Sequence, residues 1–447
     1  TFTVVLNAQP TDNVVLSISS ADTGEATVTS LLTFTSANWD AAQTVTVTGV
    51  DDDLIDGTQS TTMTIAVVDN SSDDSFDSLN DETVSVTTTD DDVAGFTIAE
   101  TGGSTSVAES GTTDTFTVVL NAQPTDNVVL SISSADTGEA TVTSLISFTS
   151  ANWDTPQTVT VTGVDDNLVD GTQTTSLSIV IVDEISDDTF HSVPDQTVSV
   201  TTTDDDVAGF TIAETDSSTS VSESGTTDTF TIVLDAQPDG DVKLTISSAD
   251  TDEATVTSLL EFTSANWDTP QTVTVTGVDD DIIDGTQTTA ITVAVVDSVS
   301  VDDFHSVDDE TVSVTTTDDD VAGFTIAETG GSTSVAESGT TDTFTVVLDA
   351  QPDSDVVLTI TSSDTGEATV TSELTFTSAN WDTAQTVTVT GVDDDLIDGT
   401  TTSTITVSVN DGSSDDNFDA VDDETVSVTT TDNDVAGFTI AETGGST

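Results

Sequence analysis

The strongest constraint on the fold is an internal repeat of 114 residues. The motif SANWD recurs with its tryptophan at Trp39, Trp153, Trp267 and Trp381, and no insertion or deletion changes this spacing. The chain of 447 residues is therefore nearly four copies of one unit. The copies are repeat 1 (1–92, without its opening), repeat 2 (93–206), repeat 3 (207–320) and repeat 4 (321–434), and 435–447 begins a fifth. A unit of this length can bury its own core and is too long for a solenoid turn, so we expect tandem domains.

Alternation with period two predicts that each unit is made of strands. In repeat 2 the alternating segments are GFTIAE, STSVAE, DTFTVVL, NVVLSIS, SLISFTS, QTVTVTGV, TTSLSIVIV and QTVSVTTT, separated by Gly, Asp, Asn, Ser and Pro. This pattern is typical of an all-β, Greek-key, immunoglobulin-like β-sandwich, here repeated in an extended rod. We expect Phe116, Val118, Leu120, Val159 and Val161 to face inward, and Thr117, Thr160 and Thr162 to face water. Trp153 is interpreted as a core or corner anchor rather than a sugar-stacking platform.

The charge of the chain excludes several classes of partner. Its formal charge is -83 at pH 7, and its one cationic side chain is Lys243. Nucleic acid and anionic membrane surfaces would both repel such a chain. No apolar run approaches the ~20 residues of a membrane-spanning helix. With no cysteine, disulfides and thiolate metal sites are excluded as well.

Two acidic segments recur in every repeat, each at the end of a predicted strand. In repeat 2 they are GVDDNLVDGTQ and the closing TTTDDD. If both strands point to the same end of the sandwich, about six carboxylates meet there. Each like-charged pair at ~5 Å costs roughly 3 kcal/mol at an effective dielectric of ~20, and a few pairs rival the net stability of a domain. A cation is needed, and calcium fits an all-oxygen site. The open alternative is a solvated acidic surface of the salt-adapted kind.

The same segments carry a resemblance to a known family. The SVAESG segment with Glu109, SSADTGEATV with Asp136, VTVTGVDDNLVDGTQ and the closing VTTTDDD are similar to Calx-beta domains, in the form found as tandem repeats in large bacterial surface proteins. This chain departs from the family in having Asp170 where Glu is usual, and Asn433 within one closing run. The resemblance implies calcium ligands at these positions in each repeat. The implied ligands are Asp22, Asp51, Asp52, Asp56, Asp90, Asp91 and Asp92 in repeat 1; Glu109, Asp136, Asp165, Asp166, Asp170, Asp204, Asp205 and Asp206 in repeat 2; Glu223, Asp250, Asp279, Asp280, Asp284, Asp318, Asp319 and Asp320 in repeat 3; and Glu337, Asp364, Asp393, Asp394, Asp398, Asp432 and Asp434 in repeat 4.

The residue inventory argues against an enzyme. The chain lacks Cys, Tyr and Arg, and its two histidines, His191 and His305, lie in a loop whose sequence varies between repeats. We expect a structural role, as the calcium-stiffened repeat region of an extracellular bacterial fibre at the cell surface, either an adhesin stalk or a biofilm-matrix filament. Two alternatives remain open: a multivalent module for binding carbohydrate or protein, and a salt-adapted surface coat without specific calcium sites.

The ends of the chain suggest how copies relate to one another. Thr1 corresponds to Thr115, so repeat 1 lacks the first predicted strand, and 435–447 supplies a spare one. We expect the chain to be a window of a longer polypeptide with neighbouring copies in a continuous array. The alternative is that the spare strand of one copy completes the next by strand addition.

Overall fold

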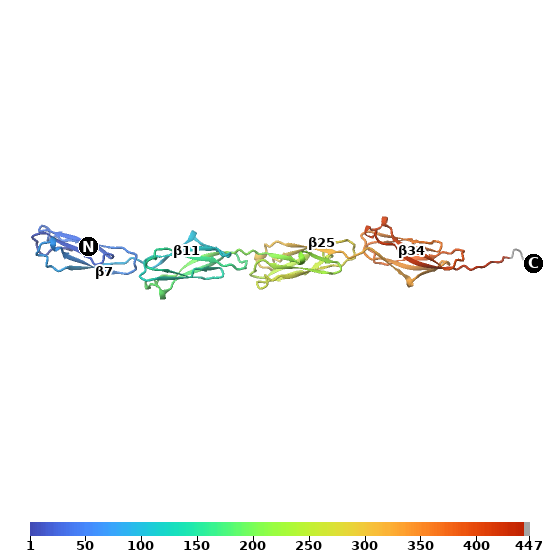
Figure 1. The fold of residues 1–447 in the computed structure, drawn as a ribbon, viewed down its shortest axis with the longest axis horizontal. Coiled ribbons are helices and arrows are strands. Elements are labelled where there is room, and N and C mark those ends of the chain that lie inside the picture. Colours follow the sequence, from blue (N-terminus) through green and yellow to red (C-terminus); the bar gives the residue numbers. More distant parts are fainter. Residues whose placement is uncertain (442–447) are drawn as a thin grey trace, which may run out of the picture. The chain divides into compact units, whose positions relative to one another are not determined.

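The computed structural model describes residues 1–441, which divide into two compact units, Thr1–Asp206 and Val207–Thr447. Each unit contains two of the sequence repeats, and the division at 206/207 coincides with the border between repeats 2 and 3. Figure 1 labels one strand in each repeat, β7, β11, β25 and β34.

Every repeat is built from short strands. In the first unit, repeat 1 contains β1 (Phe2–Val4), β2 (Val14–Ser20), β3 (Ala26–Val28), β4 (Leu31–Phe34), β5 (Gln43–Val45), β6 (Val47–Gly49), β7 (Gln59–Val67) and β8 (Glu82–Thr88). Repeat 2 contains β9 (Phe96–Glu100), β10 (Thr105–Ala108), β11 (Thr113–Leu120), β12 (Val128–Ser134), β13 (Ala140–Val142), β14 (Leu145–Phe148), β15 (Gln157–Gly163), β16 (Gln173–Ile181) and β17 (Gln196–Thr203).

The second unit repeats this order. Repeat 3 contains β18 (Phe210–Glu214), β19 (Thr219–Ser222), β20 (Thr227–Leu234), β21 (Val242–Ser248), β22 (Ala254–Val256), β23 (Leu259–Phe262), β24 (Gln271–Gly277), β25 (Gln287–Val295) and β26 (Glu310–Thr317). Repeat 4 contains β27 (Phe324–Glu328), β28 (Thr333–Ala336), β29 (Thr341–Leu348), β30 (Val356–Ser362), β31 (Ala368–Val370), β32 (Glu373–Phe376), β33 (Gln385–Gly391), β34 (Thr401–Val409) and β35 (Glu424–Thr431).

The helical elements are single turns of 3-10 helix in the loops. They are η1 (Asp69–Ser71), η2 (Thr101–Gly103), η3 (Asp183–Ile185), η4 (Asp188–Phe190), η5 (Thr215–Ser217), η6 (Asp302–Phe304), η7 (Thr329–Gly331), η8 (Asp411–Ser413) and η9 (Asp416–Phe418). Across residues 1–441, no helix has the length and apolar character needed to cross a membrane.

Two sheets face each other in repeat 2, as in an immunoglobulin-like sandwich. One has the strand order β13-β15-β11-β9 and the other β10-β17-β16-β12-β14. Most neighbours are antiparallel, but β10 runs parallel to β17. The chain therefore changes sheet between β9 and β10, and repeats 3 and 4 have the same order. This confirms the predicted all-β class of tandem β-sandwiches.

Alternating apolar side chains fill the space between the sheets. Phe116, Val118, Leu120, Val159 and Val161 are buried, as predicted, and Thr117, Thr160 and Thr162 lie on the outer, partly exposed face. Trp153 packs against the edge of this core, and its backbone carbonyl accepts a hydrogen bond from Leu120 N at 3.1 Å. The tryptophan is thus a corner anchor, as interpreted from the sequence.

One strand of each sandwich was not predicted. Residues Ala140–Val142 form β13, although the sequence pattern placed a turn there. Three residues are too few for a period to be visible, and the strand exists because it pairs with β15, with Ala140 opposite Gly163. The consequence for the site is that Glu139, which precedes β13, lies beside the end of β15.

The core makes a direct prediction for β14, where Phe148 is fully buried and Leu145 is 58% exposed. Replacing Phe148 with Ala leaves a cavity and should destabilise repeat 2 by about 3–5 kcal/mol, measured by urea denaturation. The matched change Leu145→Ala on the same strand should cost less than about 0.5 kcal/mol. Equal effects of the two changes would contradict the assigned facing of this strand.

Candidate metal centre

Several strand ends meet at one pole of repeat 2. Because β10 and β17 are parallel, Ala108 and Thr203 end together, and Glu109 N donates a hydrogen bond to Thr203 O at 3.0 Å. Strand β13 is antiparallel to β15, so its first residue lies beside Gly163, the last residue of β15. The acidic residues that follow or precede these ends therefore gather at the same pole. The convergence expected from the sequence is present.

Asp204 joins two of the acidic loops. Its Oδ2 accepts hydrogen bonds from Gly171 N at 2.7 Å and Asp170 N at 3.1 Å, and its Oδ1 accepts one from Asp206 N at 2.7 Å. The equivalent Asp318 and Asp432 accept from Gly285 N and Gly399 N, both at 2.8 Å. In repeat 4 these backbone hydrogen bonds lower the pKa of Asp432. The first aspartate of each closing run thus fixes the loops in place.

Carboxylates from different loops come close enough to share one ion. Five groups of three offer oxygen atoms that all lie within 4.8 Å of one another in the described part of the chain. They are Glu109, Asp166 and Asp206; Glu223, Glu253 and Asp284; Glu223, Asp318 and Asp320; Glu337, Glu367 and Asp398; and Glu337, Asp432 and Asp434. Glu223 and Glu337 each belong to two groups. In repeat 3 and in repeat 4, a single glutamate therefore takes part in two candidate cation positions.

The glutamate after β10 is the most unusual side chain of the cluster. Glu109 is only 1% exposed, and its Oε2 has no hydrogen-bond partner among residues 1–441. Burial, followed by the negative charges of Asp204, Asp166 and Asp170, raises the pKa of Glu109 to about 7. An orphaned buried carboxylate oxygen costs folding free energy unless a proton, a water molecule or a cation satisfies it.

A second buried acid in the same repeat shows the contrasting case. Asp187, at the N-terminus of η4, is also buried, but its oxygens accept four hydrogen bonds from Thr125, Asp126 and Thr189 at 2.7–2.9 Å. Burial alone would raise the pKa of Asp187, but these hydrogen bonds outweigh it and lower the pKa to about 2. Asp187 therefore needs no cation. Glu109 has no comparable set of hydrogen bonds among the described residues.

Some residues of the cluster were not predicted from the sequence. Glu139 lies beside Glu109, its buried Oε2 lacks a hydrogen-bond partner among the described residues, and burial together with Asp170 and Asp136 raises its pKa. Its counterparts Glu253 and Glu367 belong to the groups above. A signal was available, because each repeat has a glutamate directly before Ala-Thr-Val in the segment that becomes β13.

The structure brings together only part of the predicted ligand set. Within the described residues, the groups above include Glu109, Asp166, Asp206, Glu223, Asp284, Asp318, Asp320, Glu337, Asp398, Asp432 and Asp434. The predicted residues outside these groups are Asp22, Asp51, Asp52, Asp56, Asp90, Asp91, Asp92, Asp136, Asp165, Asp170, Asp204, Asp205, Asp250, Asp279, Asp280, Asp319, Asp364, Asp393 and Asp394. Asp136 accepts a hydrogen bond from Gly138 N at 2.9 Å and so shapes its own turn. Asp165 and Asp205 are exposed.

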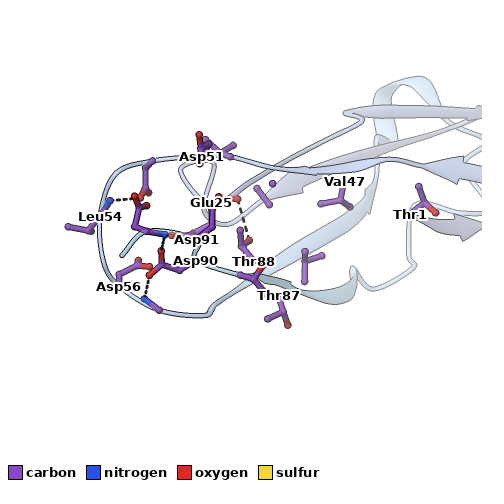
Figure 2. A pocket seen from close by; sticks show the side chains of 18 residues that line it. Thr1, Glu25, Val47, Asp51, Leu54, Asp56, Thr87, Thr88, Asp90 and Asp91 are labelled. Atoms are coloured by element: carbon purple, nitrogen blue, oxygen red, sulfur yellow. Dashed lines mark hydrogen bonds between the residues drawn. The ribbon is translucent and has the colours of Figure 1, made fainter. Parts of the chain in front are cut away.

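Repeat 1 shows what the cluster is like without the buried glutamate. Its carboxylates line a cavity of about 460 Å³, and Figure 2 shows Glu25, Asp51, Asp56, Asp90 and Asp91 around it. Asp90 again holds the loop, by accepting a hydrogen bond from Gly57 N at 2.7 Å. Among the described residues, no three carboxylates of this repeat share a candidate ion position. The tight groups therefore occur where the glutamate after β10, or its equivalent, is present.

The donor set suits calcium. All the donor atoms are carboxylate oxygens, which favour hard cations, and they lie on loops that can supply the six to eight oxygens that calcium takes. The orphaned Oε2 atoms of Glu109, Glu139 and Glu253 point to an ion rather than to further protein contacts. The residues present therefore fit calcium.

Comparisons with known proteins find structural similarities of low sequence identity and low TM-score. No family model matches the chain, and no curated protein matches it. Similar solved structures include the surface layer protein SbsC, domains 4–9 (17% identity, 95% of this chain, 58% of that chain, TM-score 0.22). The I-band fragment I67–I69 from titin is 9% identical, with 76% of this chain and 96% of that chain covered and a TM-score of 0.25. CBD12 from CALX1.2 is 13% identical, with 49% of this chain and 99% of that chain covered and a TM-score of 0.21. The chain thus spans 58% of the SbsC fragment.

The raised pKa values predict how the metal-free protein responds to pH. Burial and neighbouring carboxylates raise the pKa of Glu109 and Glu223 to about 7 and that of Asp320 to about 6. The stability gained from their protonated forms is fully present below the unfolded pKa values of about 4 and is lost as pH rises through 6 to 7. We expect the melting temperature to fall between about pH 5 and pH 8, measured by calorimetry after metal removal on a chelating resin.

The control for this experiment is the double variant Glu109→Gln and Glu223→Gln. It cannot ionise at these positions, so its melting temperature should depend less on pH over the same range. A metal-free wild type whose melting temperature is constant or rises over this range would contradict the assigned burial of the two glutamates.

Proposed function

We propose that this chain is the calcium-stiffened repeat region of an extracellular bacterial fibre, acting as a spacer in an adhesin stalk or a matrix filament. The observation that carries the proposal is the buried glutamate after β10 and its equivalents, which lie among loop carboxylates with an oxygen left unsatisfied. Sites of this loop-based kind in extracellular modules bind calcium weakly and fill where calcium is abundant, which supports a role outside the cell.

The acidic loop of repeat 3 also contacts the next repeat of the same unit. Asp281 O accepts a hydrogen bond from Gln351 N at 2.7 Å, and Asn417 Nδ2 donates one to Ile283 O at 3.2 Å. Ile283 packs against the core of repeat 4. Asp284, which follows directly, belongs to a candidate ion position with Glu223. An ion held there would order the loop that forms the joint.

The first unit has the same contact between repeats 1 and 2. Gln123 N donates a hydrogen bond to Asp53 O at 2.6 Å, and Ile55 packs against the core of repeat 2. The loop therefore has two sides, one with carboxylates and one with an aliphatic side chain. Calcium on the first side would limit motion of the second, which is the physical basis proposed for stiffening.

Calcium binding and joint stiffness provide the test. Calorimetric titration of the chain should show calcium binding, and Glu223→Gln should weaken binding in repeat 3 by about tenfold or more, because it removes charge from both candidate positions there. The same variant should make calcium less effective at extending the chain, measured by small-angle X-ray scattering with calcium and with chelator.

Glu310→Gln is the matched control, because Glu310 is an exposed glutamate of the same repeat on β26. It should bind calcium as the wild type does. If Glu223→Gln and Glu310→Gln have equal, small effects, the acidic residues act as a salt-adapted surface. If calcium binds but scattering does not change, the sites exist and the stiffening role is wrong.

A further inference from the structure

Two strand edges face each other across a gap at one corner of the sandwich of repeat 3. Strand β18 pairs with β20 and is the last strand of its sheet. In the other sheet, β19 pairs with β26 only from Val314 to Thr317, so 310–313 has no neighbouring strand on that side among the described residues. Between the two edges lies a cavity of about 360 Å³, lined by Phe210, Ile212, Glu214, Glu310, Thr311 and Val312.

The backbone of β18 can pair with another strand at this corner. Asp235 N donates a hydrogen bond to Gly209 O at 3.0 Å, so the backbone of Gly209 faces β20. Backbone groups alternate between the two sides of a strand, so the N–H and C=O groups of Phe210, Ile212 and Glu214 point away from β20. An edge with unpaired backbone groups accepts an extended segment by strand addition.

A single side chain makes this corner different in repeat 2. There Gln196 Nε2 donates a hydrogen bond to Phe96 O at 2.8 Å, which ties β17 to β9. Glu310 takes the place of Gln196 in repeat 3, and a carboxylate cannot donate a hydrogen bond to the equivalent carbonyl of Phe210. Repeat 4 also has a glutamate at this position, Glu424. The tie of repeat 2 is therefore replaced by a negative charge in repeats 3 and 4.

The corner of repeat 3 has an apolar middle and a carboxylate at each end. The side chains of Phe210 and Val312 are buried, and Ile212 is half-buried. Glu310 and Glu214 are exposed. Glu310 lies at the Phe210 end, as Gln196 does beside Phe96, whereas Glu214 is four residues further along β18, roughly 14 Å away at 3.4 Å per residue. An extended segment with one apolar side chain between two cationic ones complements this arrangement.

A second copy of this chain cannot supply the complementary charges. Its one cationic side chain is Lys243, whose Nζ lies 3.4 Å from Glu261 Oε1 on the neighbouring strand. The cations that complement this corner therefore come from a different protein.

We propose that the corner between β18 and β26 binds an extended basic segment of another protein by strand addition to β18. Side chains alternate along an added strand, so the positions that face the cavity follow the pattern cation-x-apolar-x-cation. The apolar residue lies opposite Ile212, and the two cations lie near Glu310 and Glu214. Repeat 4 provides a second site, with Glu328 and Glu424 at the equivalent positions. This inference goes beyond the proposed calcium role and does not depend on it.

Two peptides of equal composition test the pattern by fluorescence anisotropy at physiological ionic strength. A labelled peptide Ser-Lys-Thr-Leu-Thr-Lys-Ser presents both lysines on the same face as the leucine when it is extended. The peptide Ser-Thr-Lys-Leu-Lys-Thr-Ser presents them on the opposite face. The first should bind at least fivefold more tightly. Equal affinities would mean that the peptides respond only to the net charge of the chain, and this result would overturn the proposal.

Substitutions at the position that differs between repeats locate the binding. The double variant Glu310→Gln and Glu424→Gln has the residue of repeat 2 at both corners and should weaken binding of the first peptide at least tenfold. Gln196→Glu should raise the number of bound peptides from two to three. Glu373→Gln, at an exposed glutamate on β32, is the matched control and should bind as the wild type does.

Unchanged binding in the double variant would contradict the assigned site. Self-association of the wild-type chain that this variant abolishes, seen by sedimentation velocity, would also overturn the proposal, because the occupant would then be a second copy. Calcium titration of the same variant separates these outcomes from failure of the calcium sites, because Glu310 and Glu424 lie outside the candidate ion positions.

Discussion

A buried carboxylate that faces other carboxylates is the feature on which the rest of the structure depends. Glu109 lies among Asp166, Asp170 and Asp204 at the end of repeat 2, and burial raises the free energy of its ionised form. In repeats 3 and 4 the equivalent carboxylates face Glu223 and Glu337 in the same way. The repulsion at each pole can be relieved by protons, by separation of the loops, or by a cation. Under the proposed calcium role, a cation would relieve the repulsion and also keep the loops folded.

The position of this cluster links its chemistry to mechanics. The loop between the seventh and eighth strands of a complete sandwich has carboxylates on one side and an aliphatic residue on the other. Ile283 contacts the next repeat, and Asp284, its neighbour in sequence, takes part in the cluster. Under the proposed calcium role, a change in ion occupancy would therefore act on the residues that join one domain to the next. In the alternative of a solvated acidic surface, ion occupancy would have no effect on the joints.

The sequence predicted the architecture well because two-residue alternation and exact repetition are visible without tertiary information. Phe116 and Val159 were assigned to the core, and the acidic ends of β15 and β17 were expected to meet on the condition that both strands point to the same end of the sandwich. Strand β13 was missed because three residues carry no period and depend on pairing with β15. Glu139 was missed for the same reason, since the pairing of β13 brings it beside Glu109. The sequence also could not show that Asp204 fixes the loops through backbone N–H groups, or that its equivalents Asp318 and Asp432 also belong to candidate ion positions, because both depend on tertiary contacts.

The most direct test of the account is anomalous X-ray diffraction from crystals of this chain grown with calcium. The account predicts a peak in the anomalous difference map between the carboxylates of Glu223, Asp318 and Asp320, where their oxygens lie within 4.8 Å of one another. A well-ordered crystal that shows no peak there, with Glu223 instead hydrogen-bonded to protein or water at neutral pH, would contradict it.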